Sequence, residues 1–177
     1  SIDNLTVTGV ATTPCATPTA PATNLSFGTI TDVSIQGSFT AANPATDNYL
    51  IVMSTNSALI SNPVNGQIYN FGDTVGDGSV IENGASTSFT ATGLSEQTTY
   101  YFFVFPMNST CTGGPLYYTT SVLNGNATTI AGLPSCAAPP TQPTNLSFGT
   151  TTSTSIAGSF TATTADQYLV VRSLSVS

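Results

Sequence analysis

The sequence predicts an all-β protein arranged as a sandwich of antiparallel strands, and three observations support this prediction. Charged residues make up only 5% of the 177 residues, so hydroxyl and amide side chains must cover the surface, as on the polar face of a sheet. The run YYFFVF at 100–105 is too short for a helix and typical of a buried strand. An internal repeat spaced 121 residues apart (24 to 145) has the size of a sandwich domain.

Strands are expected wherever apolar and polar residues alternate between turn signals. In the second of them, side chains at 33, 35, 37 and 39 share one face because strand residues alternate in direction. A long segment, 55–85, contains QIYNF and GSVIEN and is expected to supply two further short strands. The main strands are expected at residues 23–29, 33–41, 47–54, 86–91, 98–107 and 116–128.

The turn before the aromatic run carries a recognisable spacing. Leu94, Thr98 and Tyr100 form the pattern Leu-x-x-x-Thr-x-Tyr. This resembles the turn into strand F of fibronectin type III domains, where the Tyr hydroxyl bonds to upstream backbone. The expected strands correspond in order to A (23–29), B (33–41), C (47–54), C′, E (86–91), F (98–107) and G (116–128), an order over residues 15–130 that is similar to the same family. Phe39 and Phe160 stand where the family has a Trp, and the C–E segment (55–85) is longer. The resemblance implies an immunoglobulin-like, fibronectin type III β-sandwich.

The internal repeat divides the chain into two copies. NLSFGT at 24–29 recurs at 145–150, GSFTA at 37–41 recurs at 158–162, and Cys15 recurs as Cys136. We expect an N-terminal strand from a preceding domain or arm at 1–12, a complete domain at 13–131, and strands A to C of a second domain at 132–177. Three strands leave their apolar face uncovered, so we expect the chain to continue, or another chain to supply the missing strands.

The resemblance also suggests how the cysteines pair. In such a sandwich, the chain entry before strand A and the F–G turn lie at the same pole, which predicts a disulfide between Cys15 and Cys111. Closing that loop stabilises the domain by ~4 kcal/mol in the chain-entropy account. Cys136 would then pair with an F–G turn of the second copy. The alternative is three unpaired thiols, and the absence of CxxC and His excludes a zinc site of the usual kind.

The composition excludes several classes of function. The net charge is −7 with Arg172 as the single basic residue, which disfavours nucleic acids and anionic lipids as partners. No apolar run approaches the ~20 residues that span a bilayer, so membrane insertion is not expected. Because the chain has no His and no Lys, it cannot use nucleophilic catalytic mechanisms that depend on these residues. We expect no enzyme activity and no cofactor.

One candidate site is an aromatic face. If Tyr100, Phe102 and Val104 point into the core, their neighbours in the strand point outward. With strand C beside them, they would form an apolar surface that binds sugar rings or a neighbouring protein. The alternative is that the C–E segment covers this face with Ile68, Tyr69, Phe71, Val80 and Ile81. The candidate binding residues are Leu50, Val52, Tyr101, Phe103 and Phe105.

Two further candidates lie in the glycine-rich turn at 72–78. Asp73 and Asp77, with backbone carbonyls of the turn, are a candidate Ca²⁺ site, the alternative being a solvated hairpin turn. Asp73-Thr74-Val75 resembles the short O-glycosylation signal of Bacteroidetes, which makes Thr74 a candidate modification site.

The same region suggests the kind of protein to which the chain belongs and its location at the cell surface. PVNGxxY at 63–69 and the turn at 72–78 look like repeats of large secreted or cell-surface proteins of Bacteroidetes. This resemblance implies an extracellular spacer, stalk, filament or adhesin repeat whose partners are neighbouring repeats, other surface proteins or glycans. The alternative function is a carbohydrate-binding accessory region of a secreted glycoside hydrolase.

Overall fold

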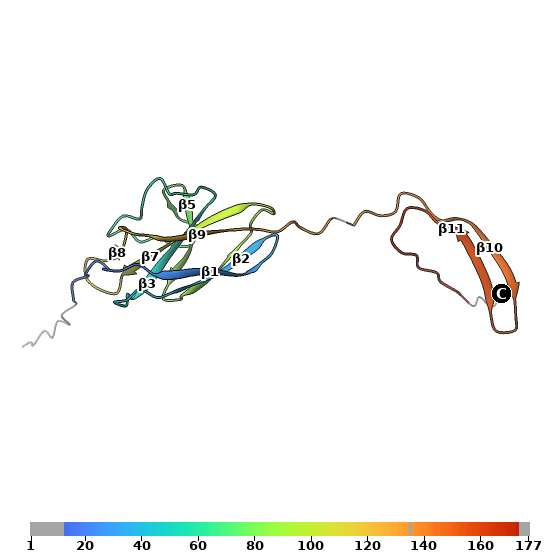
Figure 1. Ribbon diagram of the computed structural model, residues 1–177, viewed down its shortest axis with the longest axis horizontal. Coiled ribbons are helices and arrows are strands. Elements are labelled where there is room, and N and C mark those ends of the chain that lie inside the picture. The colour runs from blue at the N-terminus through green and yellow to red at the C-terminus, as the bar shows by residue number, and fades with distance from the viewer. Residues whose placement is uncertain (1–12, 135, 174–177) are drawn as a thin grey trace, which may run out of the picture. The chain divides into compact units, whose positions relative to one another are not determined.

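A computed structural model describes residues 13–134 and 136–173, and the chain divides into two compact units, 1–132 and 133–177 (Figure 1). All regular secondary structure in the described ranges is β-strand, which confirms the predicted fold class. Within those ranges there is no helix with the length and apolar character needed to cross a bilayer. The strand predicted at 1–12 lies outside the described residues.

Two antiparallel sheets build the first unit in the order expected for a fibronectin type III sandwich. One sheet has the order β1 (Thr23–Ile30), β2 (Ser34–Thr40), β6 (Ser88–Thr92). The other has the order β4 (Thr74–Val75), β5 (Gly78–Gly84), β3 (Asn48–Ser54), β7 (Thr99–Asn108), β8 (Leu116–Tyr117), and β9 (Leu123–Thr128) also pairs with β7. The two sheets correspond to A-B-E and C′-C-F-G, so the sandwich prediction is confirmed.

The last predicted strand, 116–128, is divided in two by a proline in its partner. β8 pairs with Met107 and Asn108, and β9 pairs with residues 99–104 of β7. The Pro106 carbonyl accepts from the Tyr118 N–H at 2.9 Å, so residue 106 turns its backbone toward β8 and β9. Since proline has no N–H to donate on that side, the ladder is interrupted there.

The first core fills the space between the two sheets. Its centre is formed by Ile35, Ile51, Phe89, Phe102 and Val104, all buried. At its edge, the Tyr100 hydroxyl accepts a hydrogen bond from the Ser95 N–H at 3.0 Å, as the Leu-x-x-x-Thr-x-Tyr spacing predicts. This bond fixes the turn that leads into β7.

A second core lies on the other face of the larger sheet. The segment 55–77 crosses this face and is fixed by hydrogen bonds, including Gly66 N–H to the Pro115 carbonyl at 2.7 Å and the Tyr117 hydroxyl to the Gln67 carbonyl at 2.7 Å. Burial and the neighbouring Tyr69 raise the pKa of Tyr117 to about 12, so this hydroxyl stays a donor. The first unit therefore has three layers rather than two.

The second unit contains a hairpin of β10 (Thr144–Thr151) and β11 (Ile156–Thr161). Its register repeats that of β1 and β2, since Phe148 pairs with Gly158 as Phe27 pairs with Gly37. The sequence also predicts a third strand in this unit, but residues 168–173 form none. In the first unit the matching strand β3 lies between β5 and β7, and the described residues of the second unit provide no such neighbours.

The packing of the Phe89 ring against Gly37 of β2 can be tested by substitution. A Cβ placed on Gly37 would lie 2.2 Å from Cζ of Phe89, so the ring occupies the space that a side chain would need. We predict that Gly37→Ala lowers the free energy of unfolding by about 1–3 kcal/mol through overpacking, measured by chemical denaturation. Gly28→Ala is the control, since its nearest heavy atom lies at 3.9 Å. Equal stability of the two variants would contradict this packing.

Candidate functional site

A disulfide closes one pole of the first unit. Cys15 and Cys111 are bonded, with their Cα atoms 4.9 Å apart and 96 positions apart in sequence, as the sequence analysis predicts. Cys136 is unpaired and exposed. The disulfide joins the chain entry, which precedes β1, directly to the turn that follows β7.

Backbone hydrogen bonds support this covalent link. The Cys15 N–H donates to the Thr112 carbonyl at 2.9 Å, and the Thr112 N–H donates to the Thr13 carbonyl at 3.1 Å. Pro14 and Thr112 thus form a parallel bridge. The Asn108 side-chain amide adds a bond to the Ala16 carbonyl at 2.8 Å. The chain entry is therefore held to the turn on both sides of the disulfide.

Asp47 organises the same turn from the start of β3. Its carboxylate accepts from the Ser109 N–H at 2.9 Å, the Thr110 N–H at 2.8 Å and the Thr110 hydroxyl at 2.6 Å. Partial burial opposes ionisation, but these bonds outweigh it and hold the pKa of Asp47 below its usual value. The ionised carboxylate acts as a fixed anchor for the turn that carries Cys111.

The opposite pole holds the chain exit. The Thr129 hydroxyl donates to the Ser95 carbonyl at 2.6 Å and accepts from the Thr98 N–H at 2.9 Å. The Gly132 N–H donates to a Glu96 carboxylate oxygen at 2.6 Å. Entry and exit are thus attached at the two ends of β7.

The structure corrects the prediction of an exposed aromatic binding face, because this face is covered. Leu50, Val52 and Phe105 are fully buried, Phe103 is nearly so, and Tyr101 packs against them, because the segment 55–77 covers this face. A buried surface offers no contact to a sugar or protein partner. The structure therefore shows the covered alternative.

The residues that cover this face differ in part from those expected. Tyr69 and Val80 pack in the second core, Ile81 packs against the first core, and Ile68 and Phe71 are exposed. Sequence reasoning missed other members, which come from the cover segment, from β4 and from the region that follows β7. These are Leu59, Val75, Tyr117 and Val122.

The carboxylates of Asp73 and Asp77 in the glycine-rich turn accept hydrogen bonds from backbone and side-chain N–H groups. Asp73 accepts from the Asn70 N–H at 2.7 Å. Asp77 accepts from the Asn56 amide and from the Ile60 N–H, and these bonds lower its pKa. Among the described residues, no group of three or more His, Cys, Asp or Glu side chains is placed to hold a metal ion. Thr74 is exposed on β4, and its modification stays a prediction.

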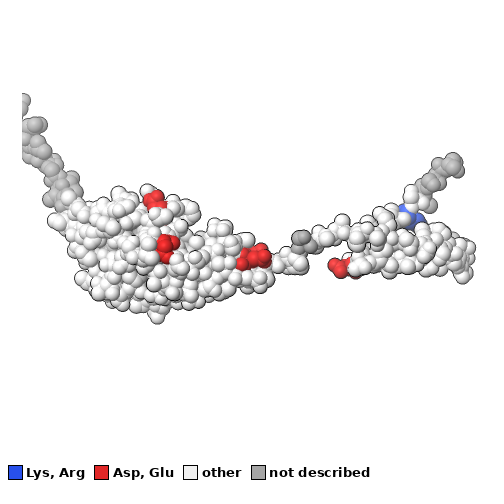
Figure 2. Space-filling model, turned by 90° about the horizontal axis from the view of Figure 1, so that it is seen from above, with Lys and Arg blue, Asp and Glu red and all other residues white. Residues whose placement is uncertain are grey.

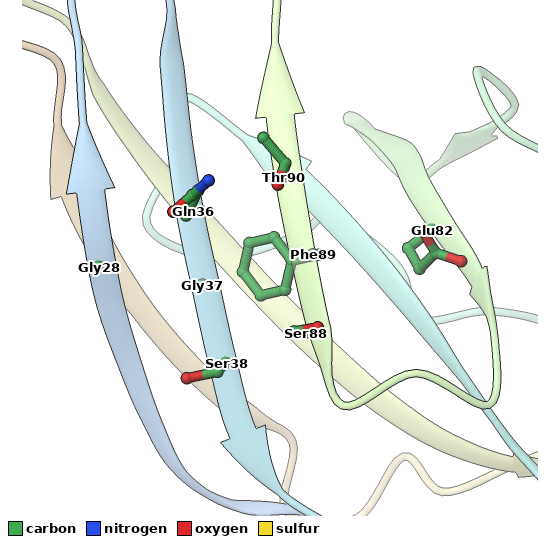
Figure 3. A pocket seen from close by; sticks show the side chains of 8 residues that line it. All are labelled: Gly28, Gln36, Gly37, Ser38, Glu82, Ser88, Phe89 and Thr90. Atoms are coloured by element: carbon green, nitrogen blue, oxygen red, sulfur yellow. The ribbon is translucent and has the colours of Figure 1, made fainter.

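A polar hollow lies beside the smaller sheet (Figure 3). It has a volume of about 600 Å³, and its lining includes Gln36, Ser38, Ser88 and Thr90 from β2 and β6, with Glu82 contributed by β5. Glu82 is the single titratable group in this lining, so the hollow lacks the paired acid and base of general acid–base catalysis. In Figure 2 the acidic groups of the visible face are scattered over a largely uncharged surface.

Comparison with known proteins returns sandwich domains among the similar solved structures. The fibronectin type III domain of human collagen XX is 26% identical over 67% of this chain and 100% of that chain, with a TM-score of 0.40. The fourth such domain of a human protein is 16% identical over 73% of this chain and 94% of that one, with a TM-score of 0.45. A computationally redesigned β-sandwich is 16% identical over 68% and 98%, also at 0.45. No protein-family model and no curated protein matches the chain.

The Asp47 anchor predicts a specific pH dependence of stability. Because the folded-state pKa is lowered, the contribution is present above the unfolded value of about 3.9 and is lost as the pH falls below it. We predict that Asp47→Asn lowers the free energy of unfolding by about 1 kcal/mol at pH 7, a value reduced for solvent screening. Denaturation at several pH values should show the difference shrinking below about pH 4.

Asp166, the repeat counterpart of Asp47, supplies the matched control. Asp166→Asn should leave the unfolding of the first unit unchanged across the same pH range. A deficit of Asp47→Asn that stays constant from pH 7 to pH 3 would contradict the assigned role of the carboxylate.

Proposed function

We propose that this chain is a load-bearing spacer in a repeated stalk or adhesin of a secreted or cell-surface protein, and that it has no catalytic role. The observation that carries the proposal is the disulfide that joins the chain entry to the far end of β7. Disulfides persist in oxidising, extracellular environments. The resemblance noted in the sequence places such repeats on bacterial surfaces, where filaments and adhesins transmit force.

The disulfide defines a short path for force through the first unit. Tension that enters before Cys15 passes through the sulfur bridge to Cys111, and from there to β9 and the exit at Gly132. While the disulfide is intact, the 96-residue loop between the cysteines cannot be pulled out to its full length. Most of the sandwich is therefore shielded from stretching.

The last strand on this path is loaded in shear. β9 is antiparallel to β7 over six residue pairs, from Thr99–Thr128 to Val104–Leu123. The exit pulls β9 along its own axis while the disulfide holds β7 at the other end. In this geometry several backbone hydrogen bonds are loaded together, and each resists the displacement. Such an arrangement suits a spacer that keeps its length under tension.

The aromatic surface on which the carbohydrate-binding alternative depended is covered in the structure. Neighbouring repeats are therefore the partners that this proposal expects.

Stretching single molecules of the full chain between its termini tests the load path. We predict that reduction adds about 330 Å of contour length, since the 96-residue loop then extends at about 3.4 Å per residue. The oxidised chain should not release this length. Optical tweezers in the presence and absence of a reductant measure the difference directly.

Two cysteine variants separate the disulfide from other causes. Cys111→Ser should show the long extension without reductant, and Cys136→Ser should behave like the native chain. Unfolding of the oxidised first unit at a force as low as that of Cys111→Ser would contradict the spacer proposal.

A further inference from the structure

The smaller sheet of the first unit ends in a strand edge that carries no charge. β6 pairs with β2 on one side, and the order β1-β2-β6 leaves its other edge without a partner strand among the described residues. Residues 83–93 contain no Asp, Glu, Lys or Arg. Proteins often protect such an edge from pairing with another chain by placing lysine on it, and this chain has no lysine. The edge therefore needs another kind of protection.

The register of β6 shows which of its backbone groups face the open edge. The Phe39 N–H donates to the Thr87 carbonyl at 3.0 Å, so every second residue from Thr87 onward directs its backbone groups toward β2. The backbone N–H and C=O groups of Ser88 and Thr90 consequently point to the other side. These are the groups to which a further strand would bind.

A serine side chain occupies one end of this edge. The Ser86 hydroxyl donates to the Ser88 carbonyl at 2.7 Å and accepts from the Ser88 N–H at 3.1 Å. Both outward backbone groups of Ser88 are thus bound within the same chain. Among the described residues, no side chain binds the outward backbone groups of Thr90 in this way. The edge is therefore capped by Ser86 at one end and open at its centre.

A β-bulge in β5 turns a carboxylate toward the same edge. The register of β5 against β3 shifts by one residue at Ile81, so Glu82 lies opposite Ile51. Ile51 and Ile81 both belong to the first core, and paired residues share a face, so Glu82 lies on the side of the smaller sheet. Asn83 lies on the other side, where its amide donates to the Tyr69 carbonyl at 2.6 Å. Without the bulge, Glu82 would point away from β6.

The polar hollow beside the smaller sheet brings this carboxylate and the β6 edge together (Figure 3). Glu82 lines it with Ser88 and Thr90, and the lining contains no cation. Glu82 is half-buried, so a strand that docked on β6 would take more of its charge out of water without supplying a partner. A second copy of the chain would also bring a second carboxylate to the contact, and the two like charges would repel each other.

We propose that β6 is an edge through which two copies of this chain can pair antiparallel, and that Glu82 and Ser86 prevent this pairing in the native protein. The edge is complementary to itself, because the exposed face of β6 carries only Ser and Thr side chains and Thr90 can lie opposite Thr90 of the second copy. Cross-strand pairs of Ser and Thr stabilise an antiparallel sheet. This inference does not depend on the load path through the disulfide.

The double variant Glu82→Gln, Ser86→Ala removes both blocks and is compared with the otherwise native full chain. Cys136→Ser is present in every chain, so that no disulfide links two copies. In sedimentation at neutral pH, the double variant should dimerise at least about tenfold more tightly, because the like-charge repulsion is gone. In NMR hydrogen exchange, its Thr90 amide should exchange at least about tenfold more slowly than in the native chain, because pairing with the second copy protects it.

Two further variants test whether the contact lies at β6. Glu96→Gln removes the same charge outside the hollow and should leave association unchanged. Thr90→Lys, added to the double variant, should reverse the gain, because like charges then face each other across the new strand pair. If the double variant does not fold, Glu82→Gln alone is compared in the same way, with a smaller gain expected because the Ser86 cap remains. The proposal is overturned if the variant associates no more than the native chain, if it associates without protection of the Thr90 amide, or if that amide is already protected in the native chain.

Discussion

The burial of both faces of β7 is the constraint on which the structure depends. Alternate side chains of this strand enter different cores: Phe102 and Val104 pack between the two sheets, and Phe103 and Phe105 pack under the segment 55–77. β7 also pairs with β3 along one edge and with β8 and β9 along the other. A ten-residue strand with few charged neighbours thus joins three layers, and substitution on either face affects a core.

The two poles of the first unit are the two ends of this strand. The Tyr100 hydroxyl and Thr129 fix the end where the chain leaves, while Asp47 and the Cys15–Cys111 bond fix the end where it enters. Because both attachments are made to one buried strand, the proposed spacer would carry force between entry and exit through β7 and its neighbours. The mechanical proposal therefore follows from the position of β7 and needs no binding site on the surface.

In the first unit, sequence patterns predicted the features that leave a periodic or pairwise signal. Alternation located the main strands, the Leu94-to-Tyr100 spacing located the corner, and topology paired Cys15 with Cys111. The inward-facing residues of the segment 55–77 were harder to predict, because this segment has no periodic pattern. Individual hydrogen bonds set which of its side chains point into the second core, and Ile68 and Phe71 are exposed. Asp47 was overlooked as an anchor, although its recurrence as Asp166 in the repeat was a usable signal. Neither the alternation of residues nor the repeat shows which backbone N–H groups a side chain such as Asp47 will bind.

The central claim is that the layer over the second core is part of one cooperative structure with the sandwich. Native-state hydrogen exchange of the Gly66, Gly72 and Tyr117 amides tests it, because each forms a bond between the cover segment and the larger sheet. Gly66 donates to the Pro115 carbonyl next to β8, and Gly72 donates to the Val80 carbonyl of β5. The Tyr117 N–H of β8 donates to the side-chain oxygen of Asn65 in the cover segment. The account predicts that they open with the same free energy as the amides of β7, through global unfolding. Opening of these three amides at a free energy several kcal/mol lower would show that the cover is a separate, easily detached loop, and would contradict the account.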